Sequence, residues 1–586
     1  MRVLLLHPED DFRGPWKDQR WDWVVDLGRA PKSFYDEWSA TLGCPVSSIY
    51  DFAVEVADLQ DWRSLFAVGM GGVVDRFGLD WWDVFSLMLQ PEMQDVRLAL
   101  RLAARLTGCR ALTTSRPSLL ANAVHLRSGI PLQVLQSGVR PRLAHRVARY
   151  RTALMNLSFQ QLRQVVYDKY DPHYLWRRKF ARSIPRSSQP IVLLPSAYSN
   201  VTRTALKYAS VLPDQQFLLV LARESAAMSS LPANVQSVAL AAFATEPGDQ
   251  AELRGLENRW IQLERTLAEH PEFSVQVQLG IVHKGMRFLR WGLSIRNAWN
   301  RVFESYSVVG CLSADDANPY TRVPLMLAEH RGSPAVACHH GALNCSMAFK
   351  VPQCSTYLAQ GEMERDYVER ICGLDPRNVR IGAPTSPADE CALRRNDAPW
   401  VVFFAEPYEA DHWRVEAIYR EVLPRLCAAA RRSGKTVILK LHPFETAGQR
   451  RRLVKATLDK NDQRVVRIVA SPMSREILRN TWCAVTVEST AAFECASVGI
   501  PAFLCGWLRH AYSGYALQYA RFGVGRILET PADLLRIPEM IAETMPAPGV
   551  ASRLVQSISQ DLLTEVLLQP AAHNAFSGHR IEPAQT

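Results

Sequence analysis

No apolar stretch in this 586-residue sequence approaches the roughly 20 residues that a membrane-spanning helix needs. The apolar run at residues 3–6 is too short for the core of a signal peptide and is typical of a first β-strand. The twelve cysteines show no C-x-x-C pair and no paired metal-binding spacing, and several lie inside apolar runs, as Cys338 and Cys505 do. We therefore predict a reduced, cytoplasmic protein with small buried thiols.

The composition is that of ordinary folded protein. Hydrophobic residues make up 48% of the chain and charged residues 22%. A chain of this length exceeds what one hydrophobic core supports, and no internal repeat with a period of 20–50 residues is present. The sequence predicts two to four globular domains.

Positive charge is concentrated in one part of the chain. Residues 137–188 hold twelve basic and two acidic side chains, a difference equal to the whole net charge of +10. A second basic stretch, residues 283–301, interleaves arginines with tryptophans and aliphatic residues. Basic amphipathic helices of this kind suit an anionic membrane surface. The alternative interpretation is a helix clamped between domains with solvated arginines. No nucleic-acid-binding motif accompanies either stretch, so we expect no nucleic-acid partner.

Short apolar strands alternate with helices through most of the chain, which is the pattern of parallel α/β domains. Candidate strands at residues 2–6, 23–27, 111–114 and 132–135 indicate a first α/β region, and residues 386–399 are typical of a linker. We predict an N-terminal α/β region (1–136), a basic helical segment (137–188), an α/β domain (189–385), a second α/β domain (398–535), C-terminal helices (536–571) and a disordered tail (572–586).

Two motifs in the last α/β domain carry residue types that bind anions. The apolar run at 437–439 places Lys440 and His442 at the carboxyl end of a strand, where a histidine can donate to or protonate a phosphate oxygen. Pro443 ends that strand, and Glu445 follows it. An ordinary strand end is the alternative reading of this motif.

The second motif begins where a later strand gives way to a helix. Glu488, Ser489 and Thr490 stand at this junction, and the amino terminus of such a helix favours a phosphate. Glu494 lies one helical turn beyond Thr490, where a ribose hydroxyl could reach it. The alternative role for the two hydroxyl residues is simple helix capping.

The order of the two motifs, followed by Gly499-Ile500-Pro501, resembles the C-terminal donor domain of GT-B glycosyltransferases. More narrowly, it is similar to bacterial surface-polysaccharide enzymes: capsule and lipopolysaccharide sialyl- and Kdo-type transferases, and CDP-glycerol glycerophosphotransferases. The resemblance covers roughly residues 400–526. It implies that His442-Pro443 and Ser489-Thr490 hold the donor phosphate and that Glu494 binds the ribose. It also implies catalysis without a metal or cofactor, since no DxD-like carboxylate cluster lies in the donor half.

The resemblance implies a GT-B type α/β fold. Two Rossmann-like, doubly wound parallel-sheet domains would face a cleft, with an additional N-terminal α/β region and basic helical insertions. In the first of these domains, Asp315 and Asp316 end one predicted strand, and His339-His340-Gly341 ends another. The His-Gly pair resembles the QHG element of related GT-B families. Transfer to an acceptor hydroxyl needs a base. We predict Asp316 or Asp315 for this role, with His340 next; a turn and helix cap is the alternative.

An earlier polar loop is the candidate acceptor-side surface, with Ser196, Tyr198, Asn200 and Arg203 between a strand and a helix. Together these features predict a transferase. It would move a sugar, or a glycerophosphate, from a nucleotide-activated donor to a surface-polysaccharide or lipid-linked acceptor at the inner face of the membrane. The alternatives are a sugar-nucleotide epimerase of the UDP-N-acetylglucosamine 2-epimerase type and a non-catalytic polysaccharide- or membrane-binding protein.

Overall fold

The computed structural model describes most of the chain. The described residues are 1–52, 66–135, 187–223, 226–244, 250–341, 343, 354, 356–384, 396–406, 408, 412–442, 445–471, 473–508, 515–523, 525–543 and 553–569. The predicted basic segment therefore lies almost entirely outside the described residues, as do Pro443 and the C-terminal tail.

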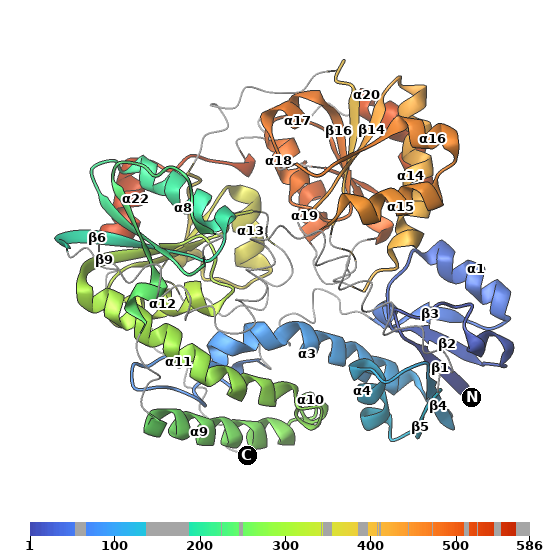
Figure 1. Ribbon diagram of the computed structural model, residues 1–586, viewed down its shortest axis with the longest axis horizontal. Helices are drawn as coiled ribbons and strands as arrows, with labels where there is room; N and C mark the ends of the chain where they lie inside the picture. Colours follow the sequence, from blue (N-terminus) through green and yellow to red (C-terminus); the bar gives the residue numbers. More distant parts are fainter. Residues whose placement is uncertain are drawn as a thin grey trace.

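Three parallel β-sheets, each flanked by helices, organise the described chain (Figure 1). When the strands of each sheet are numbered in chain order, they run 3-2-1-4-5 in the first sheet, 3-2-1-4-5-6-7 in the second and 3-2-1-4-5-6 in the third. This is the doubly wound, Rossmann-like order, which opens a crevice outside the carboxyl ends of strands 1 and 4. The predicted fold class, two such sheets with a further N-terminal α/β region, is confirmed. We call the three parts the N-terminal, central and C-terminal units.

The N-terminal unit is built on the four strands expected from the sequence and on one more, at Val46–Ser48. Val3, Leu4 and Leu5 are buried because the first strand has neighbours on both sides. Asp80 caps the long helix α3 by accepting from the Trp82 amide. The elements are β1 (Arg2–Leu6), η1 (Pro15–Asp18), β2 (Trp23–Asp26), α1 (Lys32–Leu42), β3 (Val46–Ser48), η2 (Ile49–Phe52), α3 (Trp81–Arg105), β4 (Ala111–Thr114), α4 (Leu119–Ser128) and β5 (Leu132–Val134).

The central unit carries seven strands, and one C-terminal helix, α22, returns to pack against β9 and β10. Its elements are β6 (Ser187–Ser196), α8 (Ser199–Val211), β7 (Gln216–Leu221), β8 (Val235–Ala239), η4 (Leu240–Phe243), α9 (Gln250–Glu269), α10 (Ser274–Gln278), α11 (Ile281–Ser305), β9 (Tyr306–Ser313), α12 (Pro319–His330), β10 (Ala335–Cys338), β11 (Thr356–Ala359), α13 (Glu362–Arg370), η6 (Pro376–Asn378), β12 (Val379–Ile381) and α22 (Gln560–Leu568).

The C-terminal unit repeats the β-α rhythm predicted for residues 398–535. Its elements are β13 (Trp400–Phe404), α14 (Val415–Arg432), β14 (Thr436–Lys440), α15 (Ala447–Thr457), α16 (Lys460–Val465), β15 (Val466–Val469), α17 (Arg475–Asn480), β16 (Thr481–Thr486), α18 (Ala491–Ser497), β17 (Ala502–Cys505), η8 (Gly506–Leu508), α19 (Tyr515–Arg521), β18 (Arg526–Leu528), η9 (Pro531–Arg536) and α20 (Ile537–Glu543).

Helix α11 contains the second basic stretch, and it packs against α3, α9 and α12 (Figure 1). Trp299 is fully buried and donates to the Tyr320 carbonyl at 3.1 Å. The Arg296 guanidinium is buried too, 2.7 Å from Asp75 and 2.6 Å from Glu252. The structure therefore favours the clamped-helix interpretation of this stretch over a membrane-facing one.

The described cysteines form no disulfides with one another, and all but Cys109 are buried. In Cys338, as in the other fully buried thiols, removal from water raises the pKa, which keeps the sulfur protonated and unreactive. Within the described residues, no helix is both long and apolar enough to cross a membrane.

Candidate active site

Two of the predicted site elements meet where the central and C-terminal units face each other. Gly341 follows β10 and Thr490 follows β16, so each stands at the carboxyl edge of its own sheet. A Cβ atom built on Gly341 would lie 3.8 Å from the Thr490 methyl carbon. The His339-His340-Gly341 element and the Ser489-Thr490 element therefore line opposite walls of one junction, although 148 positions separate them in the sequence.

The two predicted aspartates have different environments. Asp315 accepts from the Ala317 amide at 2.9 Å and from the Asn318 side chain at 2.7 Å, so it holds the turn that leads into α12. Asp316 is 6% exposed, and one of its oxygens lies 3.7 Å from the Arg322 guanidinium. The turn-and-cap role given as the alternative for this run describes Asp315 well.

Arg322 is a site residue that the sequence did not reveal. It is fully buried and makes a 2.6 Å ion pair with Asp83 of α3. The carboxylates of Asp83 and Asp316 raise its pKa against the opposing effect of burial, so the guanidinium stays charged. The buried guanidinium thus lies between the two carboxylates and balances their charge.

One ring nitrogen of His340 has a hydrogen-bond partner in the backbone. Its Nδ1 lies 3.2 Å from the Ala314 carbonyl oxygen, to which a proton on that nitrogen is donated. Nε2 is then the nitrogen with a lone pair. The rings of His339 and His340 lie 4.6 Å apart, and Gln360 donates to the His339 carbonyl at 3.4 Å. These contacts orient the pair at the carboxyl edge of β10.

Lys440 and His442 end β14 as the sequence predicted. The Lys440 ammonium donates to the Leu441 carbonyl at 2.9 Å, and burial lowers its pKa while the Glu494 and Glu445 carboxylates raise it. Burial and then the charge of Lys440 lower the pKa of His442. A neutral imidazole next to an ammonium is a pair of hydrogen-bond donors that suits a diphosphate.

Glu445 is structural in this arrangement. It accepts from the His442 amide at 2.7 Å and from Arg450 Nε at 2.8 Å, and both members of the Glu445–Arg450 pair are almost fully buried. Its carboxylate fixes the backbone of the turn after His442. In this arrangement Glu445 positions the turn that carries His442.

The loop after β16 is held by Glu406, a second residue that the sequence did not reveal. One Glu406 oxygen accepts from the Thr486 hydroxyl at 2.9 Å, the Val487 amide at 3.2 Å and the Glu488 amide at 2.9 Å. Glu406 comes from the end of β13, the strand next to β16. The only signal in the sequence is a glutamate directly after an apolar run.

Within this loop, Ser489 accepts from the Ala491 amide at 3.3 Å, whereas Thr490, the N-cap residue of α18, makes no side-chain cap hydrogen bond. Thr490 and Glu494 are exposed, and Glu488 is half-buried. Burial lowers the pKa of Lys440, and Glu494 lies close enough to oppose that effect. The structure brings Lys440, Thr490 and Glu494 to the same edge of the sheet.

The four predicted acceptor-side residues differ in their exposure to solvent. Ser196 is buried, with its hydroxyl 2.7 Å from that of Thr202, and Asn200 accepts from Arg203 at the surface. Tyr198 is 38% exposed at the carboxyl end of β6. Tyr198, Asn200 and Arg203 are exposed, and Ser196 is not.

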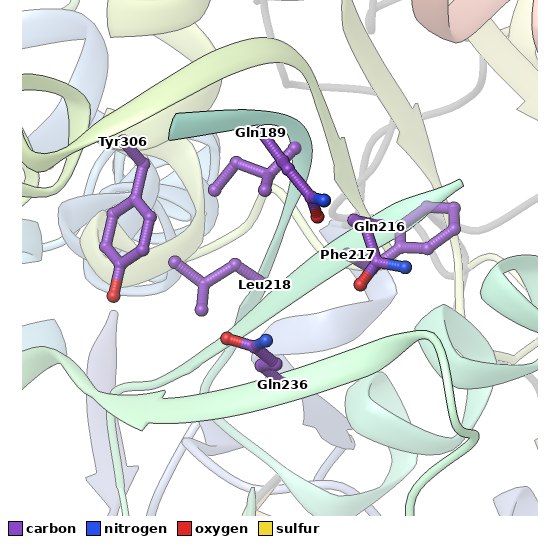
Figure 2. Close-up of a pocket in the computed structure, with 7 residues that line it drawn as sticks. Gln189, Gln216, Phe217, Leu218, Gln236 and Tyr306 are labelled. Atoms are coloured by element: carbon purple, nitrogen blue, oxygen red, sulfur yellow. The ribbon is translucent and has the colours of Figure 1, made fainter. Parts of the chain in front are cut away.

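A recess on the central sheet lies away from all of these residues. Its lining comes from the amino ends of the strands, and Figure 2 shows the glutamine side chains and the Tyr306 ring arranged around Leu218. Within the described part of the chain, no three His, Cys, Asp or Glu side chains gather as ligands for a metal ion.

Comparison with known proteins gives structural matches only, since no family model and no curated protein matches the sequence. The UDP-N-acetylglucosamine 2-epimerase of Neisseria meningitidis, solved with UDP-N-acetylglucosamine, is 10% identical with a TM-score of 0.38, over 65% of this chain and 99% of that one. The wall teichoic acid polymerase TagF is 9% identical with a TM-score of 0.36, over 73% and 98%. A glycosyltransferase from Rickettsia africae is 7% identical with a TM-score of 0.37, over 66% and 94%. At these values the fold assignment rests on the strand order of this chain itself.

Proposed function

We propose that this protein is a glycosyltransferase that moves a sugar from a nucleotide-activated donor to an acceptor hydroxyl. The observation that carries the proposal is the approach of Thr490 to Gly341. It brings an edge rich in phosphate-binding groups to within reach of an edge that offers a base. Both edges are the carboxyl ends of parallel strands, where open α/β sheets bind their ligands.

The C-terminal unit would hold the donor. Lys440 and His442 would donate to the diphosphate, the backbone around Glu488 and Thr490 would line the same wall, and Glu494 would accept from a ribose hydroxyl. Because burial keeps His442 neutral, its contribution is a hydrogen bond rather than a full charge. Such donors stabilise the negative charge that grows on the departing phosphate.

The central unit would supply the base. We assign this role to Nε2 of His340, because Asp315 is occupied by its turn and Asp316 by Arg322. The acceptor oxygen attacks the anomeric carbon, its proton passes to His340, and the bond from that carbon to the phosphate breaks with its electrons leaving on the nucleotide. Asp316 then acts as a fixed negative charge beside the site.

The resemblance to surface-polysaccharide enzymes supports a polysaccharide or lipid-linked acceptor on the cytoplasmic side of the membrane. Contact with an anionic membrane would fall to the basic segment 137–188, because the tryptophans of α11 are occupied inside the protein. The substrate class of the acceptor is the subject of the next subsection.

A nucleotide panel tests the proposal. One of CMP, CDP, UDP or GDP should raise the thermal unfolding temperature, and Glu494→Ala should weaken that nucleotide about tenfold, the value of one charged hydrogen bond of about 1.4 kcal/mol. Glu476→Ala, an exposed glutamate of α17, is the matched control. The proposal fails if no nucleotide stabilises the protein and His442→Ala changes nothing. An epimerase would instead convert the nucleotide sugar with no acceptor present.

A further inference from the structure

Arg223 stands just beyond the end of β7, at the same carboxyl edge of the central sheet as the candidate site. Its guanidinium carbon lies 5.5 Å from the ring centre of Tyr198 and 5.8 Å from that of Tyr320. The two rings come from different connections, one after β6 and one at the start of α12. The arginine is thus held where three strands of the sheet end.

Tyr320, one of the two rings beside Arg223, is itself held in place. Trp291 of α11 donates to the Tyr320 hydroxyl at 3.3 Å, and the rings of these two residues meet edge to face at 5.6 Å. Tyrosine faces attract a guanidinium and reduce its freedom. An arginine held in this way loses less conformational entropy when it binds a planar or tetrahedral anion.

Arg223 differs from the buried arginines of the central unit in whether a carboxylate lies next to the guanidinium. Arg296 pairs with Asp75 and Glu252, and Arg322 pairs with Asp83 and Asp316. Across the residues that the structure describes, no carboxylate pairs with Arg223, whose side chain is half-buried. A preoriented guanidinium without an internal counter-charge is a binding site for an external one.

We propose that Arg223 binds an anionic group, a carboxylate or a phosphate, carried by the acceptor. That the group belongs to the acceptor rests on the proposed function, whereas anion binding at Arg223 does not. The acceptor would then be an acidic or phosphate-bearing glycan and not a neutral one. Tyr198, half-exposed beside Arg223, would cover the apolar face of the same unit.

The strand order sets where this anionic group lies. Strands in a sheet are about 4.8 Å apart. β7 is separated from β9 by β6, and β10 lies one strand further. Arg223 is therefore roughly 10 Å from the end of β9 and roughly 15 Å from His340 at the end of β10. The bound anion would therefore lie further along the acceptor than the unit that carries the reacting hydroxyl.

Calorimetric titration of the full-length protein tests the site with three probes: glucuronate, glycerol phosphate and glucose. Binding of at least one anionic probe should weaken at least tenfold in Arg223→Gln, with Arg223→Lys between the two because it keeps the charge but not the stacking. Arg331→Gln is the matched control, since Arg331 also lies over a ring, that of Phe303, on the same unit. Glucose should bind no better to the wild type than to Arg223→Gln.

The probe that responds identifies the source of the anion, a sugar carboxylate or a phosphate. Equal binding of both anions by wild type and Arg223→Gln, or a preference for glucose, would overturn the proposal. If Arg223→Gln does not fold, the comparison of wild type with Arg223→Lys decides it. Nucleotide stabilisation, measured on the same variants, should not change. If no nucleotide stabilises the wild type, the result counts against the transferase proposal but leaves the proposal of an anion site at Arg223 intact.

Discussion

Replacement of Glu406 by glutamine is the sharpest test of how the C-terminal unit holds a donor. Glu406→Gln keeps the size of the side chain but removes the charge that three donors share, at 2.9, 3.2 and 2.9 Å. A hydrogen bond to a charged acceptor contributes about 1.5–3 kcal/mol and one to a neutral acceptor about 0.5–1.5 kcal/mol. The substitution therefore removes about 1 kcal/mol from each bond, or about 3 kcal/mol in all.

These bonds order the loop that carries Glu488 and Thr490, so the loss should appear mainly in ligand binding. At about 1.4 kcal/mol for each factor of ten, 3 kcal/mol corresponds to a nucleotide affinity roughly 100-fold weaker. The assay is calorimetric titration with the nucleotide that stabilises the wild type. Glu416→Gln is the control, because Glu416 lies exposed on α14 and pairs only with Arg420 at the surface in the described chain.

A nucleotide affinity within threefold of wild type would refute this role for Glu406. The thermal unfolding temperature without nucleotide, measured in parallel, separates loop ordering from global stability. Glu406→Asp keeps the charge on a shorter side chain and should fall between wild type and Glu406→Gln. A glutamine variant that binds nucleotide normally but unfolds early would show that Glu406 serves the fold alone.

Three further predictions follow from the site and its surroundings. His340→Gln should abolish sugar transfer in a product assay yet leave nucleotide affinity unchanged, and loss of both would contradict its assignment as the base. Asp83→Asn should destabilise the protein by about 3–5 kcal/mol in denaturant unfolding, because it leaves the buried Arg322 with one carboxylate fewer; a change below 1 kcal/mol would show that the pair is dispensable. Burial raises the pKa of Glu364 to about 7. At a pH between the unfolded and the folded pKa, the folded protein binds a proton at this carboxyl that the unfolded chain has lost. The free energy of unfolding should therefore fall as the pH rises from 5 to 8. Relative to Glu364→Gln the wild type should lose up to about 3 kcal/mol over that range, and parallel curves for the two proteins would argue against it.

Local features of the site could be predicted from the sequence because they depend on neighbouring residues. An apolar run followed by Lys440 and His442 fixes a buried strand and a polar end, and the same holds for β16 and Ser489. Since parallel strands share their carboxyl edge, the meeting of such ends follows from the alternation of strands and helices. The approach of Gly341 to Thr490 joins two different sheets, and the sequence led us to expect it only through the resemblance to GT-B enzymes.

The residues that the sequence did not reveal act over long separations. Arg322 donates to Asp83, and 239 positions separate the two residues in the sequence. Glu406 accepts from the Glu488 amide across a separation of 82 positions. Neither separation leaves a periodic or spacing signal. The same limit explains why the sequence did not distinguish Asp315 from Asp316. Asp316 lies beside a buried guanidinium, that of Arg322, which is paired with Asp83 of α3 in the N-terminal unit.

The N-terminal unit touches both halves of the candidate site, and this assigns it a mechanical role. Asp26 receives two hydrogen bonds from Arg414, at 2.7 and 2.8 Å, and the Arg29 amide donates to the His412 carbonyl at 2.9 Å. A side chain on Gly28 would come within 2.9 Å of that same carbonyl, so the contact requires glycine there.

On its other side, the N-terminal unit reaches the central unit through Asp83 and Arg322. The N-terminal unit therefore contacts both of the units that carry the candidate site residues. A change in the angle between the two halves must either break the Asp26–Arg414 pair or move α3 against Arg322, and the second alternative alters the surroundings of Asp316. α3 thus links the N-terminal unit to the buried Arg322 beside Asp316.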